Sequence, residues 1–206
     1  MYIAIINYNM GNISSVENAF KKVGADIKVT SNIKDINNAA ALVLPGVGSY
    51  RDAYKNLEKL GIIEILKDNI RKKIFLGICL GMQLLFEYSL ENGRNTGLGI
   101  IEGYVEKIPS VVKVPHMGWN QLNILKKESK MFYGIEEGKN FYFVHSYHVI
   151  PQNKSIISST TDYGMEIAAS IEYGNICGFQ FHPEKSSTDG IKVLENFWNI
   201  VKEGRS

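Results

Sequence analysis

Short apolar runs alternate with helical stretches along the first ninety residues, and this alternation limits the folds open to the chain. The apolar runs stand at residues 2–7, 27–30, 41–44 and 74–78, with helical segments across residues 50–71. Strands joined through helices run parallel, and a parallel sheet carries helices on both faces, so its strands are apolar throughout. We therefore expect an α/β fold with a parallel sheet between two layers of helices.

Local signals predict where individual elements begin and end. Ser14 and Glu17 have the spacing of a capping box, which predicts the start of a helix that ends at Gly24. The sequence Pro-Gly-Val-Gly at 45–48 predicts that the third strand stops before it, because proline cannot donate to a strand ladder.

The pattern changes beyond about Gly93 to short β-like runs, which indicates an antiparallel or mixed extension of the sheet. An amphipathic helix is expected over residues 188–202. No repeat or linker interrupts the sequence, so we expect a single domain over residues 1–206. The β-like runs cover residues 100–108, 119–124, 141–149, 155–161, 167–173 and 176–181.

Composition excludes several classes of function. Lys and Arg number 23 against 21 Asp and Glu, a net charge of +2, which gives no strong attraction to nucleic acid. The longest apolar runs are far shorter than the roughly 20 residues that cross a bilayer. Residues 2–6 lack the pattern of a signal peptide, so we expect a cytoplasmic protein. Cys79 and Cys177 are not expected to form a disulfide.

The strongest chemical signal is a cysteine between two glycines at the end of an apolar strand. Gly77, Cys79 and Gly81 have the spacing of a nucleophile elbow, with sulfur in place of the serine oxygen. Leu80, Leu84 and Leu85 indicate that a helix follows, and a helix N-terminus favours a thiolate. The alternative is a buried structural cysteine, which is our interpretation of Cys177.

A candidate base stands in a second segment. His182 follows a β-like run, and Glu184 lies two residues on, which puts both side chains on one side of an extended backbone. This arrangement suits a histidine base oriented by a carboxylate. The alternative is a core histidine in a capped turn. His116, His145 and His148 lack the spacing of metal ligands, so we expect no metal site and no cofactor.

Together these motifs resemble the class I glutamine amidotransferases, and within them the glutaminase subunits of imidazole glycerol phosphate synthases. The resemblance runs from the first strand to the last helix. It is carried by Asn-Tyr at 7–8, Gly-Asn at 11–12, Pro-Gly-Val-Gly at 45–48, Gly-Ile-Cys-Leu-Gly-Met-Gln at 77–83, Pro-His-Met-Gly-Trp-Asn at 115–120, Phe-Val-His-Ser-Tyr at 143–147 and Gly-Phe-Gln-Phe-His-Pro-Glu-Lys-Ser at 178–186. Many relatives carry glycine where this chain has Asn9, and asparagine also tolerates left-handed backbone angles.

The resemblance implies a doubly wound sheet and a Cys79–His182–Glu184 triad that hydrolyses glutamine. It implies that the ammonia passes to a separate synthase barrel in a heterodimer. The elbow makes the backbone N–H of Leu80 one oxyanion donor. By resemblance, the other functional residues are Val47 and Gly48 for the oxyanion, Ser146, Tyr147 and Glu91 for the substrate, and Asn12, Met117, Trp119, Tyr142 and Lys185 at the partner interface and ammonia gate.

Gln83 lies one helical turn after Cys79, so its amide is expected on the same helix face, next to the α-substituents of the substrate. Its alternative is a solvent-facing helix residue. Core packing is the alternative for Trp119 and Tyr142.

The sequence leaves one alternative function open and disfavours another. A paralogue that supplies ammonia for amidination of a surface-polysaccharide sugar would keep the same motifs. A regulatory or scaffolding subunit would require loss of a triad member, and all three are present.

Overall fold

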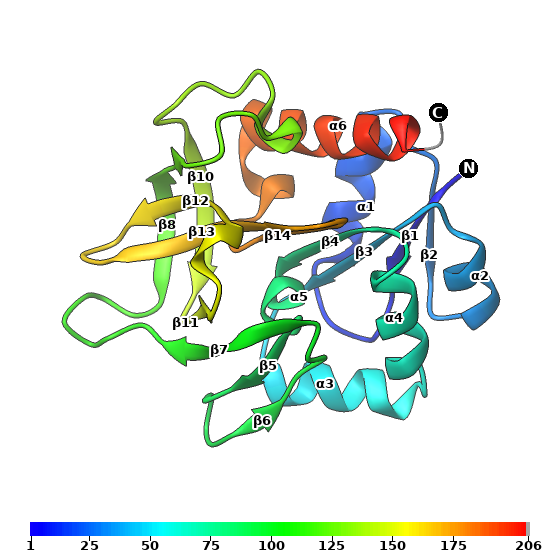
Figure 1. The fold of residues 1–206 in the computed structure, drawn as a ribbon, viewed down its shortest axis with the longest axis horizontal. Helices are drawn as coiled ribbons and strands as arrows, with labels where there is room; N and C mark the ends of the chain where they lie inside the picture. Colours follow the sequence, from blue (N-terminus) through cyan, green and yellow to red (C-terminus); the bar gives the residue numbers. More distant parts are fainter. Residues whose placement is uncertain (205–206) are drawn as a thin grey trace.

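The computed structural model describes residues 1–204 and is built around an eight-stranded mixed sheet (Figure 1). Its strand order is β2-β1-β3-β4-β14-β13-β12-β9. The first five strands in that order pair in parallel, and the remaining three are antiparallel. The parallel strands are β2 (Ile27–Thr30), β1 (Ile3–Ile6), β3 (Ala41–Gly46), β4 (Ile74–Cys79) and β14 (Ile176–Phe179); the antiparallel strands are β13 (Glu166–Tyr173), β12 (Ile157–Asp162) and β9 (Asn123–Ile124).

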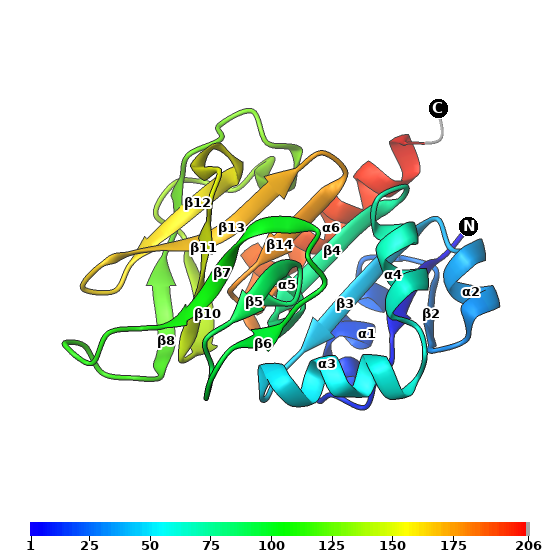
Figure 2. The same cartoon turned by 60° about the horizontal axis from the view of Figure 1, so that its bottom comes forward.

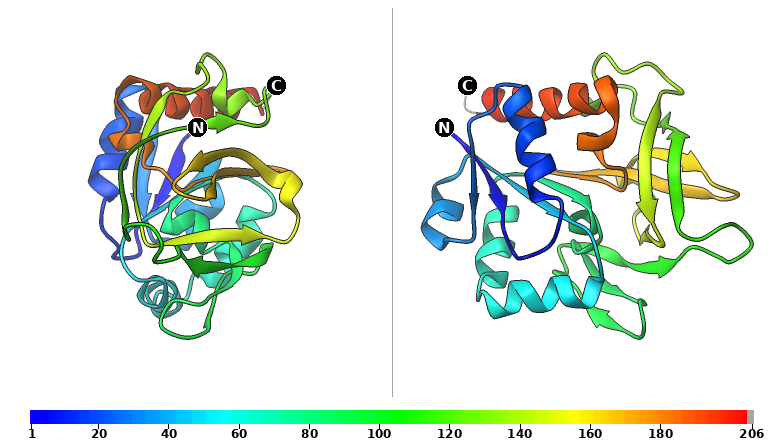
Figure 3. Two further views of the ribbon diagram at one scale, coloured as in Figure 1. Left: turned by 90° about the vertical axis from the view of Figure 1, so that its left-hand side faces the viewer. Right: turned by 180° about the vertical axis from the view of Figure 1, so that it is seen from behind.

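Helices cover both faces of this sheet, as the sequence predicts. One face carries α1 (Ile13–Lys22) and α6 (Ser187–Glu203), which lie against each other in the right-hand view of Figure 3 and pack Phe20 against Phe197. The other face carries α2 (Ile33–Asn38), α3 (Tyr50–Lys59) and α4 (Ile63–Ile70). Successive residues of β1 enter the two opposite cores, which explains why the strand is apolar at every position. Within residues 1–204 no helix is both long enough and apolar enough to cross a bilayer.

Two smaller sheets stand beside the main one (Figure 2) and confirm the predicted change of pattern. Short 3-10 turns lie in three of the connections: η1 (Lys130–Phe132) before β10, η2 (Lys154–Ile156) after β11, and η3 (Pro183–Lys185) before α6. The two-stranded sheet pairs β8 (His116–Gln121) with β10 (Asn140–His145), and the four-stranded sheet has the order β11 (Tyr147–Pro151), β7 (Ile101–Lys107), β5 (Phe86–Ser89) and β6 (Asn95–Thr96).

The predicted capping box is wrong, although the helix it announced is present. Helix α1 begins at Ile13, one residue before Ser14, and Asn12 is its N-cap, without a side-chain capping bond. Asn12 is left-handed, with a φ of 76°, so the chain turns into the helix before it reaches Ser14. Gly24, with a φ of 73°, follows the end of the helix as predicted. Asn9 also takes a left-handed angle, with a φ of 62°.

The third strand does not stop before Pro45, and the prediction there was wrong. Pro45 and Gly46 stay in register with β4, opposite Ile78 and Cys79. On the other side, the pairing of β3 with β1 ends at Val43. Pro45 therefore lies where only one neighbouring strand remains, and its missing N–H does not break a ladder.

The helix after Cys79 is also shorter than predicted. Helix α5 (Leu80–Gln83) is a single turn, and the chain enters β5 three residues later. The carbonyl of Leu84 accepts from the backbone N–H of Leu98, and that of Leu85 accepts from residues 100 and 101, instead of continuing the helix. Both leucines are fully buried, so their apolar spacing reflects core packing and not a helix face.

Candidate active site

Cys79 lies at a strained turn between β4 and α5. Its φ of 53° and ψ of −108° are outside the ordinary regions for a residue with a side chain. A side chain on Gly81 would place its Cβ 1.7 Å from the carbonyl oxygen of Leu44, and one on Gly77 would come within 2.7 Å of the Met82 nitrogen. The two glycines therefore let β3, β4 and α5 approach closely enough to form the elbow.

His182 and Glu184 meet beside this elbow because β14 pairs with β4. The two strands are parallel neighbours, and Phe179 lies opposite Ile78, so both chains leave the sheet at the same edge. His182 Nδ1 lies 2.7 Å from Glu184 Oε1, and both side chains are fully buried. The amide of Asn12 donates to the same carboxylate oxygen. The structure thus brings the three predicted catalytic residues together.

The surroundings of His182 favour its charged form. Burial alone lowers the pKa of His182, but its proximity to the Cys79 sulfur, followed by the Glu184 carboxylate, raises that pKa to about 10. Nε2 of His182 is buried and has no hydrogen-bond partner among residues 1–204. This nitrogen is therefore free to move a proton to and from a group bound at the sulfur.

A cavity of about 270 Å³ opens over Cys79 and collects the predicted oxyanion and substrate residues. Gln83 is 6% exposed, so it is not a solvent-facing helix residue. The cavity wall also contains three residues that the sequence did not predict there: Pro115, Val144 and His145. The predicted residues that line the cavity with Cys79 are Val47, Gly48, Leu80, Gln83, Glu91, Ser146 and Tyr147.

Glu91 has a structural contact in addition to its place in the cavity wall. Its Oε2 accepts from the backbone N–H of Tyr50 at 2.7 Å, in the first turn of α3. A carboxylate at a helix N-terminus is stabilised by the helix dipole. Glu91 also lies close enough to Tyr147 to raise the pKa of that phenol, although burial is the larger cause. The residue lies two positions beyond the end of β5.

Four of the predicted interface residues gather at the outer side of the triad. Trp119 and Met117 are 52% and 62% exposed, which excludes a core position for Trp119. Tyr142 is half-buried; it pairs with Trp119 across β8 and β10, and their rings meet edge to face at 5.9 Å. The carbonyl of Tyr142 accepts from the backbone of His182, and the Lys185 ammonium lies 5.7 Å from the Tyr142 ring. Asn12, predicted in the same group, contacts Glu184 directly.

Gln180 was missed by the sequence analysis. Its fully buried amide donates to Cys79 Sγ at 3.5 Å and accepts from Gln83 Nε2 at 3.0 Å. The signal was present in the sequence, since Gln180 stands two residues before His182, as Glu184 stands two residues after it. Residues at such spacing share one side of an extended chain.

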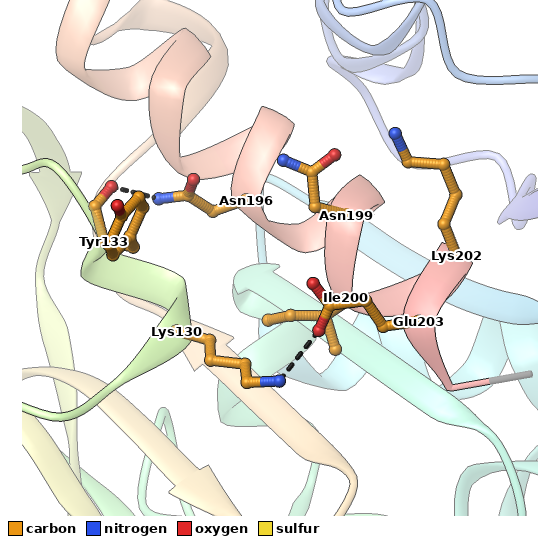
Figure 4. Close-up of a pocket in the computed structure, with 7 residues that line it drawn as sticks. All are labelled: Lys130, Tyr133, Asn196, Asn199, Ile200, Lys202 and Glu203. Atoms are coloured by element: carbon orange, nitrogen blue, oxygen red, sulfur yellow. Dashed lines mark hydrogen bonds and ion pairs between the residues drawn. The ribbon is translucent and has the colours of Figure 1, made fainter. Parts of the chain in front are cut away.

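Other features of the described residues offer less chemistry. A cavity of about 560 Å³ lies between η1 and α6, where Lys130 pairs with Glu203 and Asn196 donates to the Tyr133 carbonyl (Figure 4). Its wall contains no cysteine, serine, threonine or histidine, and so no triad pattern. Residues 1–204 hold no group of three or more His, Cys, Asp or Glu side chains arranged for a metal ion. Cys79 and Cys177 are both free.

Comparison with known proteins agrees with this geometry. The model of the class-I glutamine amidotransferase family matches residues 4–200. The imidazole glycerol phosphate synthase subunit HisH of Aquifex aeolicus is 50% identical, over 96% of both chains. The subunit of the same name from Caldanaerobacter subterraneus is 51% identical, over 97% of this chain and 98% of that one. A crystal structure of a glutamine amidotransferase shares the fold, with a TM-score of 0.77 at 16% identity over 98% of this chain and all of that one.

The chain therefore belongs to the class-I glutamine amidotransferase family. Within that family its relatives place it in the group of HisH proteins, which are named as subunits of imidazole glycerol phosphate synthase.

Proposed function

We propose that this chain hydrolyses L-glutamine to glutamate and ammonia and delivers the ammonia to a synthase partner that makes imidazole glycerol phosphate in histidine biosynthesis. The observation that carries the proposal is the buried His182–Glu184 pair beside Cys79 at its strained elbow. The names of the HisH relatives support the pathway. The two free cysteines suit a reducing compartment, and we place the reaction in the cytoplasm.

The first half of the reaction releases ammonia. Cys79 Sγ attacks the carboxamide carbon of glutamine and forms a tetrahedral oxyanion. The backbone N–H of Leu80 and the Val47–Gly48 segment, both in the cavity wall, stabilise that oxyanion. His182 Nε2 then gives a proton to the nitrogen, the C–N bond breaks, and ammonia leaves behind a glutamyl thioester.

The second half regenerates the enzyme. Water attacks the thioester carbon while His182 Nε2 takes a proton from it, and the C–S bond breaks to give glutamate and the cysteine. Glu184 holds Nδ1 of the ring at 2.7 Å, which fixes the ring orientation and stabilises the imidazolium that loses its proton in the first half and regains one in the second.

The partner surface, in this proposal, is the patch formed by Met117, Trp119, Tyr142 and Lys185. Large exposed apolar side chains mark interaction sites, and Tyr142 is bonded through its backbone to His182. A partner seated here would close the site against water and would contact β10, whose Tyr142 carbonyl accepts from the backbone N–H of His182.

The two cysteines offer a matched test. Cys79→Ala should abolish glutamine hydrolysis but leave ammonia-dependent synthesis by the assembled complex intact. Cys177→Ala, which removes the other cysteine from β14, should keep both activities. Glutamine-dependent synthesis that survives Cys79→Ala would contradict the proposal.

A further inference from the structure

We propose that Gln180 is a positioning residue of the glutaminase reaction, holding the Cys79 sulfur with its amide N–H and setting the orientation of the Gln83 amide in the substrate cavity. This inference rests on the proposed function, and it concerns a side chain that contacts the Cys79 sulfur from outside the substrate cavity. Gln180 does not line the cavity itself.

The Gln180 side chain is held between two functional residues. Its amide is fully buried, with Oε1 accepting from Gln83 Nε2 at 3.0 Å and Nε2 donating to Cys79 Sγ at 3.5 Å. Its backbone N–H donates to the Ala169 carbonyl of β13 at 2.9 Å. The residue is thus anchored to the sheet while its side chain spans the space between nucleophile and cavity wall.

A backbone carbonyl fixes which way both amides point. Gln83 Nε2 donates to the Tyr147 carbonyl at 2.8 Å, and a carbonyl oxygen only accepts. The NH₂ end of Gln83 must therefore face Tyr147 and, at the same time, Gln180. Gln180 must present its oxygen there, which leaves its own NH₂ for the sulfur of Cys79. The Gln180 NH₂ group is a donor, so it favours a Cys79 sulfur that carries no proton on the side facing Gln180.

The same series of hydrogen bonds leaves one polar group of Gln83 available to the substrate. Both N–H bonds of Gln83 are used, by Tyr147 and by Gln180, so its carbonyl oxygen is the part of the amide that stays free to accept. Gln180 keeps the amide from rotating, and rotation would present a donor in place of an acceptor. Loss of Gln180 should therefore affect both the reactivity of Cys79 and the affinity for glutamine.

Two variants of similar size separate these effects from packing. Gln180→Glu replaces the N–H donor by a carboxylate oxygen, which repels a negatively charged Cys79 sulfur. Gln180→Met removes the side-chain hydrogen bonds but keeps the length of the side chain. Asn196→Asp is the control, because it also replaces a buried amide by an acid, but outside the active site. The Asn196 side chain is 3% exposed and donates to the Met131 and Tyr133 carbonyls.

The first measurement is the rate at which iodoacetamide alkylates Cys79 as a function of pH, which needs no turnover. We expect the profile of Gln180→Glu to move to higher pH, that of Gln180→Met to move less, and that of Asn196→Asp to match the wild type. A role in packing alone would lower thermal stability without moving this profile.

The second measurement is steady-state glutamine hydrolysis in the complex with the synthase. Loss of a hydrogen bond to a charged group corresponds to a fall of roughly 10–100-fold in kcat/KM for Gln180→Met, with a rise in KM and a fall in kcat. If both Gln180 variants keep the alkylation profile and kcat/KM of the wild type, the positioning role is wrong. If the wild type itself does not hydrolyse glutamine, the proposed function fails, while the alkylation profiles still test Gln180.

Discussion

Gly81→Ala tests whether close packing at the elbow creates the catalytic geometry. The new Cβ would lie 1.7 Å from the Leu44 carbonyl oxygen, whereas carbon and oxygen in contact lie about 3.3 Å apart. Relief of that overlap requires α5 and β3 to separate by about 1.6 Å, a value set by the difference between these two distances. Backbone lies on both sides of the contact, so no side-chain rotation relieves it.

The expected effects follow from that separation. Overpacking of a core costs about 1–3 kcal/mol and more when backbone must move, so we expect a loss of about 3 kcal/mol in the free energy of unfolding. For a chain of this length that corresponds to a fall of roughly 6–12 °C in Tm. Cys79 moves with α5, and a misplacement of about 1 Å lowers catalysis by roughly 100-fold.

Calorimetry and a glutaminase assay of the complex measure the two effects. Gly61→Ala is the control, because Gly61 has a φ of 66° but nothing within 4 Å of the new Cβ. The control should lose about 1 kcal/mol from left-handed strain and keep its kcat. A Gly81→Ala protein with wild-type Tm and kcat would refute this account of the elbow.

Four further variants test the site and its surface. Glu184→Gln should lower kcat by roughly 10⁴-fold, less than removal of Cys79, in a steady-state assay, and a near-normal rate would make Glu184 a turn residue. Burial lowers the pKa of His145 to about 3, so the folded state lacks a proton that the unfolded chain binds below about pH 6.5. The contribution of neutral His145 to the free energy of unfolding is complete above that pH and declines by up to about 1.4 kcal/mol per pH unit toward pH 3. The free energy of unfolding in urea should therefore change less between pH 7 and pH 5 in His145→Gln than in the wild type. Trp119→Ala should weaken binding to the synthase in calorimetric titration without lowering Tm. Lys185→Ala should uncouple glutamine hydrolysis from synthesis when both products are measured. A Trp119→Ala protein that unfolds early but binds normally would contradict the place of Trp119 in the partner interface.

The sequence determines the local elements of this protein because neighbouring residues encode them. The apolar runs that became β1 and β4 were readable, since a strand buried on both faces has no polar position. The apolar face of α6 was readable for a similar reason. The glycines around Cys79 and the spacing of His182 and Glu184 also identified the candidate chemistry before any fold was known.

Long-range pairing decided what the sequence left open. β14 inserts between β4 and β13, which brings His182 to Cys79 across more than a hundred residues, and no local pattern specifies that neighbour. Contacts from outside also overrode local signals. Pro45 remained in a strand because β1 had already ended, and α5 stopped after one turn because the next carbonyls bonded to residues 98–101.

Two contacts of the site depended wholly on tertiary structure. Asn12 reaches Glu184, and Gln180 joins Cys79 to Gln83, in each case through side-chain amides from distant segments. A side-chain amide carries both a donor and an acceptor, so its role is undefined until its partners are known. The sequence supplied the reactive groups, and the tertiary structure alone set the hydrogen bonds that orient them.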